Sequence, residues 1–131
     1  MPTKEEEPTK KENEDWGAHN KEFASKLSSE NFESYQDWRV VVFFYSVIHY
    51  VEAYLKKEWK EEDDFKIEDH GKRRRLFAGT LPPNKYLKKY RNLEDACYNA
   101  RYQCKNFTKE KADELKKDHF EPLISYIQEN L

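Results

Sequence analysis

The sequence predicts an all-α protein, an up-down bundle of four to five helices. One long apolar run, residues 38–55, stands out in a chain with 38% charged residues. Further along, apolar side chains recur every three or four residues, which is typical of amphipathic helices. Only three of the 131 residues are glycine, and no alternating apolar–polar stretch is bounded by turn dipeptides, so strands are not expected.

The length suits one domain with a modest core. Residues 1–15 contain two prolines and no apolar residue after Met1, so we expect a disordered tail of mixed acidic and basic residues. The helical domain is expected to span residues 16–131. Its first helix is predicted at 16–28, where aromatic and aliphatic residues recur at helical spacing.

The central helix is predicted at Ser34–Glu58. Ser34 can act as its N-cap, with Asp37 three residues later in a capping-box pattern. Lys56 and Lys57 lie in its last turn, where the helix dipole favours cations. Such a helix is about 35 Å long at 1.5 Å per residue. Because it is apolar on nearly every face, it must be surrounded by protein or by lipid.

Protein is the expected surrounding. The apolar run is short for a membrane span and contains Arg39, His49 and Glu52, which are costly inside a bilayer. No secretory leader or membrane association is expected. The run also looks too apolar for a small monomer to cover, so we predict a homodimer with such helices at the interface.

Three polar residues of the central helix, Arg39, Ser46 and His49, form a drifting stripe on its surface. One interpretation is that they are buried groups bonded to a neighbouring helix, because buried polar groups are nearly always paired. The other interpretation is a role in acid–base chemistry. It applies mainly to His49, since histidine is also the commonest acid–base residue.

Residues 59–69 are acidic and lack an apolar period, so they are predicted to form an exposed loop. A short helix follows at 70–77 and is ended by Gly79. Its four consecutive cations, residues 72–75, cannot all be buried. They form either an ordinary solvated face or a surface that engages phosphates.

A third long helix is predicted to begin at Pro82–Pro83. Its core seam is formed by Tyr86, Tyr90, Leu93, Cys97, Ala100 and Cys104, at steps of three and four. On one helix Cys97 and Cys104 would lie about 10 Å apart, too far for a disulfide, which fits a reduced cytoplasmic compartment. The two cysteines and four scattered histidines lack zinc-binding spacing, so no metal or cofactor is expected.

The last predicted helix begins after Thr108, a capping residue with Glu110 in the first turn. Pro122 must kink or split this helix near residues 118–121.

The net charge of −2 hides an uneven distribution. Residues 70–105 contain ten Lys and Arg against two Asp and Glu, a local net of +8. This basic block could bind a polyanion. Alternatively, acidic and basic segments could simply face one another within the bundle or across a dimer.

Three segments together resemble the HEPN domain family, the nucleotide-binding domain of higher eukaryotes and prokaryotes. They are DWRVVVFFYSVIHYVEAYL, HGKRRRLF and YLKKYRNLEDACYNARYQCKNFTKEKADEL, and the resemblance covers about residues 16–131. It implies a HEPN-like bundle of four or five helices that is usually a homodimer. Many members are metal-independent ribonucleases, while others bind nucleotides or act beside a nucleotidyltransferase partner.

Active members carry an Arg followed four to six residues later by a His. The resemblance implies that Arg stabilises charge on a phosphate attacked by a ribose 2′-OH while His moves the proton. Here Arg101 is followed at those spacings by Lys105, Asn106 and Phe107, with no histidine. Catalysis would therefore need His49 or His70 to lie beside Arg101 in space.

The sequence accordingly favours a non-catalytic dimer that binds RNA or a nucleotide through a basic cleft. Two alternatives remain, an interaction subunit of a nucleotidyltransferase or toxin–antitoxin pair, and a ribonuclease with a displaced histidine. The candidate ligand-binding residues are Arg73, Arg74, Lys88, Lys89, Arg91, Arg101, Tyr102 and Lys105.

Overall fold

A computed structural model describes residues 8–58, 70–80, 82–103 and 105–131. These residues form only helices and their connections, with no strand among them, which confirms the predicted all-α bundle. The predicted loop at 59–69 and residues 1–7 of the predicted tail lie outside the described residues. The elements are α1 (Lys10–Lys26), the 3₁₀ helix η1 (Glu30–Tyr35), α2 (Gln36–Glu58), α3 (His70–Gly79), α4 (Asn84–Tyr102), α5 (Lys109–Leu115), the π-helical turn η2 (Lys116–Phe120) and α6 (Glu121–Glu129).

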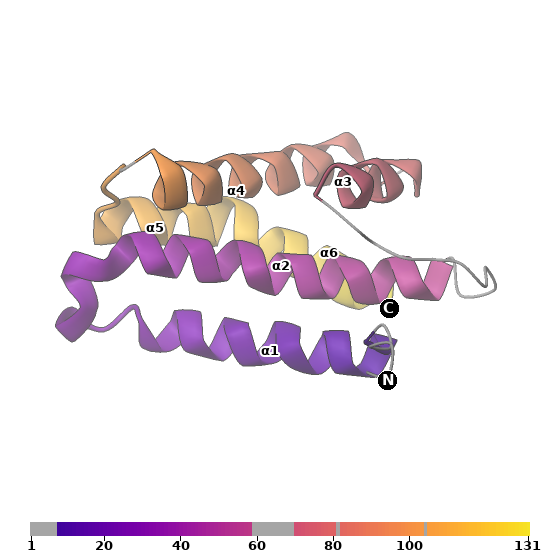
Figure 1. Ribbon diagram of the computed structural model, residues 1–131, viewed down its shortest axis with the longest axis horizontal. Helices are drawn as coiled ribbons and strands as arrows, with labels where there is room; N and C mark the ends of the chain where they lie inside the picture. The colour runs from indigo at the N-terminus through magenta and orange to yellow at the C-terminus, as the bar shows by residue number, and fades with distance from the viewer. Residues whose placement is uncertain (1–7, 59–69, 81, 104) are drawn as a thin grey trace, which may run out of the picture.

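The long helices alternate in direction along the bundle. In Figure 1, α1 and α4 run one way, while α2 and the α5–α6 segment run the other. α2 is central, since it contacts every other helix of the described structure. α3 is short and lies beside the first half of α4 (Figure 1). None of the described helices is long and apolar enough to span a membrane.

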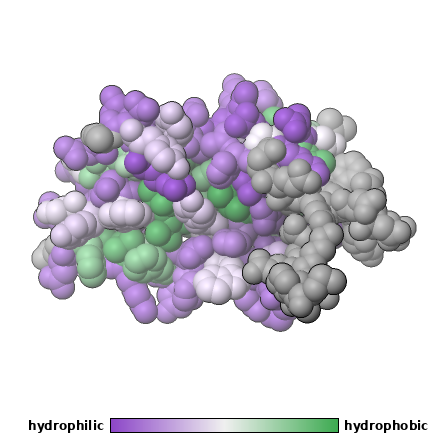
Figure 2. Space-filling view, in the orientation of Figure 1, coloured by the Kyte–Doolittle hydropathy of each residue, from purple (hydrophilic) through white to green (hydrophobic). Residues whose placement is uncertain are grey.

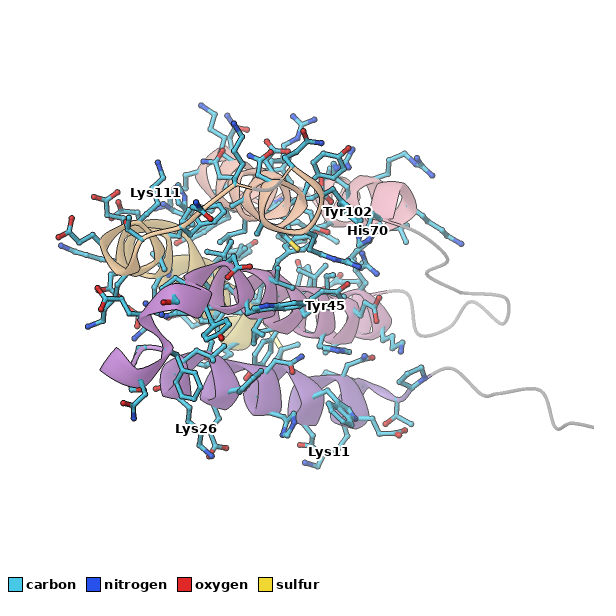
Figure 3. All side chains as sticks on the ribbon, turned by 60° about the vertical axis from the view of Figure 1, so that its left-hand side comes forward. Lys11, Lys26, Tyr45, His70, Tyr102 and Lys111 are labelled. Carbon is cyan, nitrogen blue, oxygen red and sulfur yellow. The ribbon has the colours of Figure 1, made fainter. Side chains whose placement is uncertain are left out.

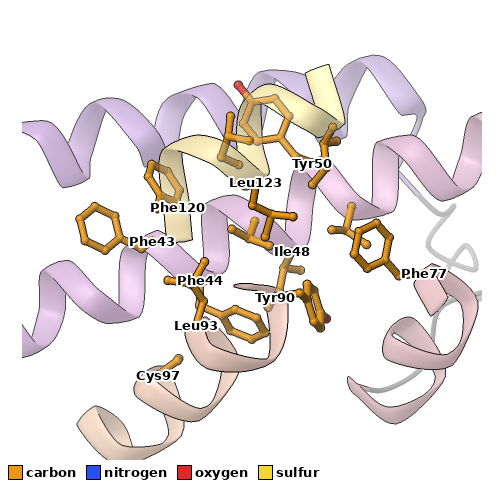
Figure 4. Packing of buried hydrophobic residues seen from close by; sticks show 14 of the residues in the cluster. Phe43, Phe44, Ile48, Tyr50, Phe77, Tyr90, Leu93, Cys97, Phe120 and Leu123 are labelled. Atoms are coloured by element: carbon orange, nitrogen blue, oxygen red, sulfur yellow. The ribbon is translucent and has the colours of Figure 1, made fainter. Parts of the chain in front are cut away.

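α2 is buried because the single chain surrounds it. Val40, Val47, Val51 and Leu55 are completely inaccessible to solvent. The other helices contribute large apolar side chains to the same core, as Figure 4 shows for Phe77 of α3, Tyr90, Leu93 and Cys97 of α4, and Phe120 and Leu123 of the last segment.

This burial corrects one inference from the sequence. The sequence predicts a dimer on the ground that a monomer cannot cover the central helix, but the other helices of the same chain cover most of α2. That reason for expecting a dimer is therefore wrong, and the homodimer itself stays a prediction.

α1 begins six residues earlier than predicted. Thr9 caps it in a capping box with Glu12, so residues 10–15 are helical rather than part of the tail. The sequence did not indicate this first turn of α1 because it contains no apolar residue, and polar contacts stabilise it instead. The Asn13 amide donates to the Glu52 carboxylate at 3.4 Å, and Lys56 donates to the Asn13 oxygen at 2.7 Å.

The remaining boundaries mostly follow the predictions. Ser34 lies inside η1 rather than capping the central helix, which begins at Gln36. Gly79 is the last residue of α3. Thr108 caps α5 through its side chain, as predicted. Pro122 lies in the first turn of α6, directly after the π-helical turn, which confirms the predicted split of the last helix.

Candidate ligand-binding groove

An open groove of about 360 Å³ lies between α2, α3 and α4, and we call it the α2–α3–α4 groove. In Figure 3, Tyr45, His70 and Tyr102 project into the same region from these three helices. The groove brings together four of the residues predicted as candidates: His70, Arg74, Arg101 and Tyr102. Its other lining residues are Phe44, Tyr45, Glu94, Asp95, Cys97 and Tyr98.

Arg101 lies among tyrosine rings at one end of this groove. Its guanidinium carbon is 4.9 Å from the ring centre of Tyr102 and 5.6 Å from that of Tyr45, within cation–π range. Its Nη1 donates to the Tyr45 hydroxyl at 2.5 Å. Tyr98 and Tyr102 are each more than half exposed, with ring centres 5.3 Å apart. We call Tyr45, Tyr98, Arg101 and Tyr102 the arginine–tyrosine platform.

Helical spacing builds most of this platform. Tyr98, Arg101 and Tyr102 occupy positions i, i+3 and i+4 of α4, which are neighbours on one helix face. Tyr45 comes from the facing α2 and is only partly buried, unlike most of that helix. The platform thus presents planar π surfaces and one cation to solvent.

A salt bridge forms the wall of the groove between α3 and α4. Arg74 donates through Nε and Nη2 to the Oε1 atom of Glu94, at 2.9 and 2.7 Å. The other oxygen, Oε2, is buried and has no hydrogen-bond partner within the described part of the chain. Glu94 therefore contributes one satisfied and one unsatisfied acceptor to this wall.

His70 lines the groove with its ring stacked on Phe44, at a centroid distance of 6.2 Å. Its Nδ1 lies 2.9 Å from Nη1 of Arg73. Because a guanidinium can only donate, Nδ1 must accept this bond, and the proton of the neutral ring is then on Nε2. His70 can thus donate a hydrogen bond, but its single lone pair is already occupied.

Arg73 itself does not present its charge to the groove. It is buried, and its Nε and Nη2 donate to the Glu52 carboxylate at 3.2 and 2.8 Å. The consecutive residues Arg73 and Arg74 therefore attach α3 to two different helices, the first to α2 and the second to α4.

The remaining predicted cations lie outside the α2–α3–α4 groove. Lys88 and Arg91 line an adjoining, more polar hollow of about 430 Å³, which shares Arg74, Glu94 and Asp95 with the groove. Lys89 donates to the backbone carbonyl of Asp118 at 2.5 Å. Lys105 is exposed beyond the end of α4.

The polar stripe of α2 faces elsewhere. The Ser46 hydroxyl donates to the Gly17 carbonyl at 2.7 Å, and Arg39 donates to Gln36 and to Asp113. The interpretation of Ser46 and Arg39 as buried groups bonded to neighbours is confirmed. His49 lies with its ring centre 6.4 Å from that of Trp16 in α1 and does not line the groove.

Sequence reasoning included Tyr102 but missed Tyr45, Tyr98 and the carboxylates of Glu94 and Asp95, because it searched mainly for cations. The spacing of Glu94, Tyr98 and Arg101 on one helix face could have indicated them. Tyr45 could not be recognised, because it resembles the core residues around it. Cys97 is buried in the groove wall, and burial raises the pKa of its thiol to about 11, so it is a poor nucleophile.

No group of three metal-binding side chains occurs among the described residues. Comparison of the chain with family models, curated proteins and solved structures found no match. The resemblance to HEPN domains is therefore still a prediction from the sequence.

Proposed function

We propose that this protein binds single-stranded RNA or a nucleotide in the α2–α3–α4 groove without cleaving it. The observation that carries the proposal is the arginine–tyrosine platform. Exposed aromatic rings stack on bases of any sequence, and each such contact is worth about 1–3 kcal/mol in single-strand binding. Tyr98 and Tyr102 have the necessary exposure, and Arg101 adds a cation in the same place.

Positive charge next to the platform suits a phosphate backbone. Lys88 and Arg91 are exposed on α4 in the adjoining hollow, which shares Arg74 with the groove. A strand that stacks on the tyrosines could pass along α4 toward these cations. Since phosphate contacts release counterions, binding should weaken steeply with added salt.

We expect no cleavage, and the bonding of His70 supports this expectation. A ribonuclease of the kind that the HEPN resemblance implies needs a histidine that can accept the 2′-OH proton. The lone pair of His70 is occupied by Arg73, and His49 does not line the groove. We therefore expect RNA to be recovered intact. Cleavage that resists EDTA and is lost in both His70→Ala and Arg101→Gln would instead support the ribonuclease alternative.

The binding experiment is a fluorescence-anisotropy titration with a labelled, unstructured ribo-oligonucleotide. Arg101→Gln and Tyr102→Leu should each weaken binding by about tenfold, in line with the loss of one stacking contact. Arg75→Gln is the matched control, because Arg75 is exposed on α3 and lines neither hollow. Equal affinity of all four proteins would rule out the groove as the binding site.

A second candidate function, protein–protein interaction, is favoured by a separate surface. Figure 2 shows apolar side chains at the surface near the junction of α1 and α2. Large hydrophobic side chains along α1, η1 and the start of α2 are between 40% and 57% exposed: Trp16, Phe23, Phe32, Tyr35 and Trp38. Exposed apolar surface of this kind is typical of interaction sites.

The predicted homodimer could use this surface, and so could the predicted nucleotidyltransferase or antitoxin-type partner. Sedimentation velocity of the purified protein shows whether this surface joins two copies of the chain, because it measures the oligomeric state without any other partner present. A dimer that Trp38→Glu converts to monomers would place the dimer interface there. A wild-type protein that is monomeric at tens of micromolar would contradict the homodimer.

A further inference from the structure

One exposed face of α4 carries cations, a carboxylate and aromatic rings in a fixed order. Its members are all exposed and follow one another at steps of three and four residues: Lys88, Arg91, Asp95, Tyr98 and Tyr102. Residues at these steps lie on one side of a helix, so they form a single stripe. The two cations come first, the carboxylate is in the middle, and the two rings belong to the arginine–tyrosine platform.

This stripe joins the two hollows of the surface. Asp95 lines both of them, the aromatic α2–α3–α4 groove and the polar hollow that contains Lys88 and Arg91. Arg74 and Glu94 also line both hollows, but their charges neutralise one another in a salt bridge. The charges that remain for a ligand are those of Lys88, Arg91 and Asp95.

These three charges do not neutralise one another. Arg91 and Asp95 are four residues apart, a spacing at which oppositely charged side chains on a helix can pair. Within the described part of the chain, however, no ion pair or hydrogen bond of the side chain is formed by Lys88, Arg91 or Asp95. The two cations would attract a phosphate chain, whereas the carboxylate would repel a bare one.

Resting on the proposed function, we propose that the ligand is a magnesium-bound 5′-triphosphate, either a free nucleoside triphosphate or the 5′ end of an RNA. Its base stacks on the arginine–tyrosine platform, its metal ion meets Asp95, and its terminal phosphates meet Lys88 and Arg91. The order of these groups along the ligand is their order along the stripe.

A magnesium ion explains the carboxylate between the rings and the cations. Mg²⁺ is commonly held by one or two protein carboxylates together with substrate phosphates and water, so a single aspartate is sufficient. The ion arrives with the phosphates and needs no group of three protein ligands. It also turns the repulsion between Asp95 and the phosphate chain into an attraction.

The length of the stripe favours a triphosphate over a monophosphate. At 1.5 Å per residue, Arg91 lies about 10 Å and Lys88 about 15 Å along α4 from Tyr98. The phosphate of a nucleoside monophosphate stays next to its ribose. The β- and γ-phosphates extend further from the ribose, through two additional P–O–P links, and this longer chain suits the separation between the rings and the cations.

The test is isothermal titration of the whole chain with ATP, ADP and AMP, each in Mg²⁺ and in EDTA. With Mg²⁺, ATP should bind at least about tenfold more tightly than AMP, because it gains charge-assisted contacts that AMP lacks, and ADP should be intermediate. An unstructured ribo-oligonucleotide with a 5′-triphosphate or a 5′-hydroxyl repeats the comparison. Tighter binding of the triphosphorylated RNA than of ATP would identify an RNA end as the source of the triphosphate, and the reverse order would identify a free nucleotide.

Asp95→Asn isolates the role of the metal. In the wild type, Mg²⁺ should tighten the binding of ATP by about tenfold relative to EDTA, because Asp95 attracts the ion and repels the bare phosphates. In Asp95→Asn this gain should disappear, and ATP in EDTA should bind more tightly than it does to the wild type. Glu129→Gln, which removes an exposed carboxylate at the end of α6, should behave like the wild type.

Arg91→Gln locates the phosphates. It should weaken the binding of ATP by about tenfold and leave that of AMP nearly unchanged, because only the longer phosphate chain reaches this residue. Circular dichroism checks that each variant is folded.

The outcomes separate this inference from the proposed function. Equal affinity of the wild type for ATP and AMP would overturn the triphosphate and leave RNA binding intact. A gain from Mg²⁺ that survives in Asp95→Asn would overturn the role of Asp95. If neither the nucleotides nor RNA bind, the proposed function fails and the inference fails with it.

Discussion

His49 shows how a single residue can couple the stability of this bundle to pH. It lies on α2 against Trp16 of α1, and its Nδ1 is buried without a hydrogen-bond partner in the described structure. Burial is the main cause that lowers the pKa of His49, with Arg73 and Lys56 adding to it against the opposing effect of Glu52. The folded protein therefore favours the neutral ring.

The consequence is a loss of stability in acid. Because the pKa of His49 in the folded protein lies below the ordinary histidine value of 6.5, the unfolded chain binds more protons than the folded one as the pH falls through that value. The stability that neutral His49 contributes is complete above about pH 6.5 and decreases below it, by at most about 1.4 kcal/mol per pH unit because the ring binds a single proton. Urea unfolding at pH 7.5 and 5.5 measures this loss. His49→Gln should show a smaller loss than the wild type, and an equal loss would contradict this account.

Glycine explains how closely the first two helices approach. A Cβ atom on Gly17 would lie 2.7 Å from ring carbons of Tyr50, which is itself buried. The Gly17 carbonyl accepts the Ser46 hydroxyl across the same contact. α1 therefore packs most closely on α2 at Gly17, which has no side chain to separate the two helices.

Gly17→Ala should destabilise the fold. Alanine is favoured in helices by about 0.5–1 kcal/mol, but overpacking typically costs about 1–3 kcal/mol, so we expect a net loss of about 1–2 kcal/mol. Gly79→Ala is the matched control, because a Cβ there meets nothing within 4 Å. Its stability should be unchanged or higher by up to about 1 kcal/mol. Chemical denaturation compares the two, and the same effect at both positions would contradict the close packing of α1 on α2.

An ion pair joins α2 to α5. Arg39 is only 1% exposed, and its Nη1 donates to Asp113 at 2.6 Å and to Gln36 at 3.1 Å. Its guanidinium also lies 5.3 Å from the ring centre of Phe43. Asp113 is half exposed and can be hydrated on its own, whereas Arg39 depends on its partners.

Asp113→Ala should therefore destabilise the protein by about 2 kcal/mol, less than a fully buried pair would lose. Glu114→Ala, at the next and exposed position, should change the free energy of unfolding by less than about 0.5 kcal/mol. The double variant Arg39→Met with Asp113→Ala should lose less than the sum of the single variants, since no charge is left buried. Additive losses would indicate that the two side chains do not interact.

At the scale of elements, the sequence was informative wherever apolar periodicity or a capping residue marked a helix. It located most of α2 and α4, the Thr108 cap and the break at Pro122. It failed at the start of α1, where Asn13, Lys56 and Glu52 replace apolar contacts. Contacts of this kind depend on a residue some 40 positions away and leave no local pattern.

At the scale of the whole molecule, the position of α3 creates the α2–α3–α4 groove. Arg73 and Arg74 attach it to Glu52 and Glu94 on different helices, and Phe77 anchors it in the core. The sequence predicted the basic helix but not which of its cations would be buried. It therefore included Arg73 among the ligand-binding residues, and it omitted the carboxylates that orient the two arginines.

Binding in this groove is the central claim, and backbone amide chemical shifts followed by NMR during titration with an unstructured ribo-oligonucleotide test it most directly. We predict that the largest shifts occur at Tyr45, in residues 70–74 and in residues 94–102, and that they fade as salt is added. Shifts confined to the outer face of α1, or no shifts at all, would contradict the claim.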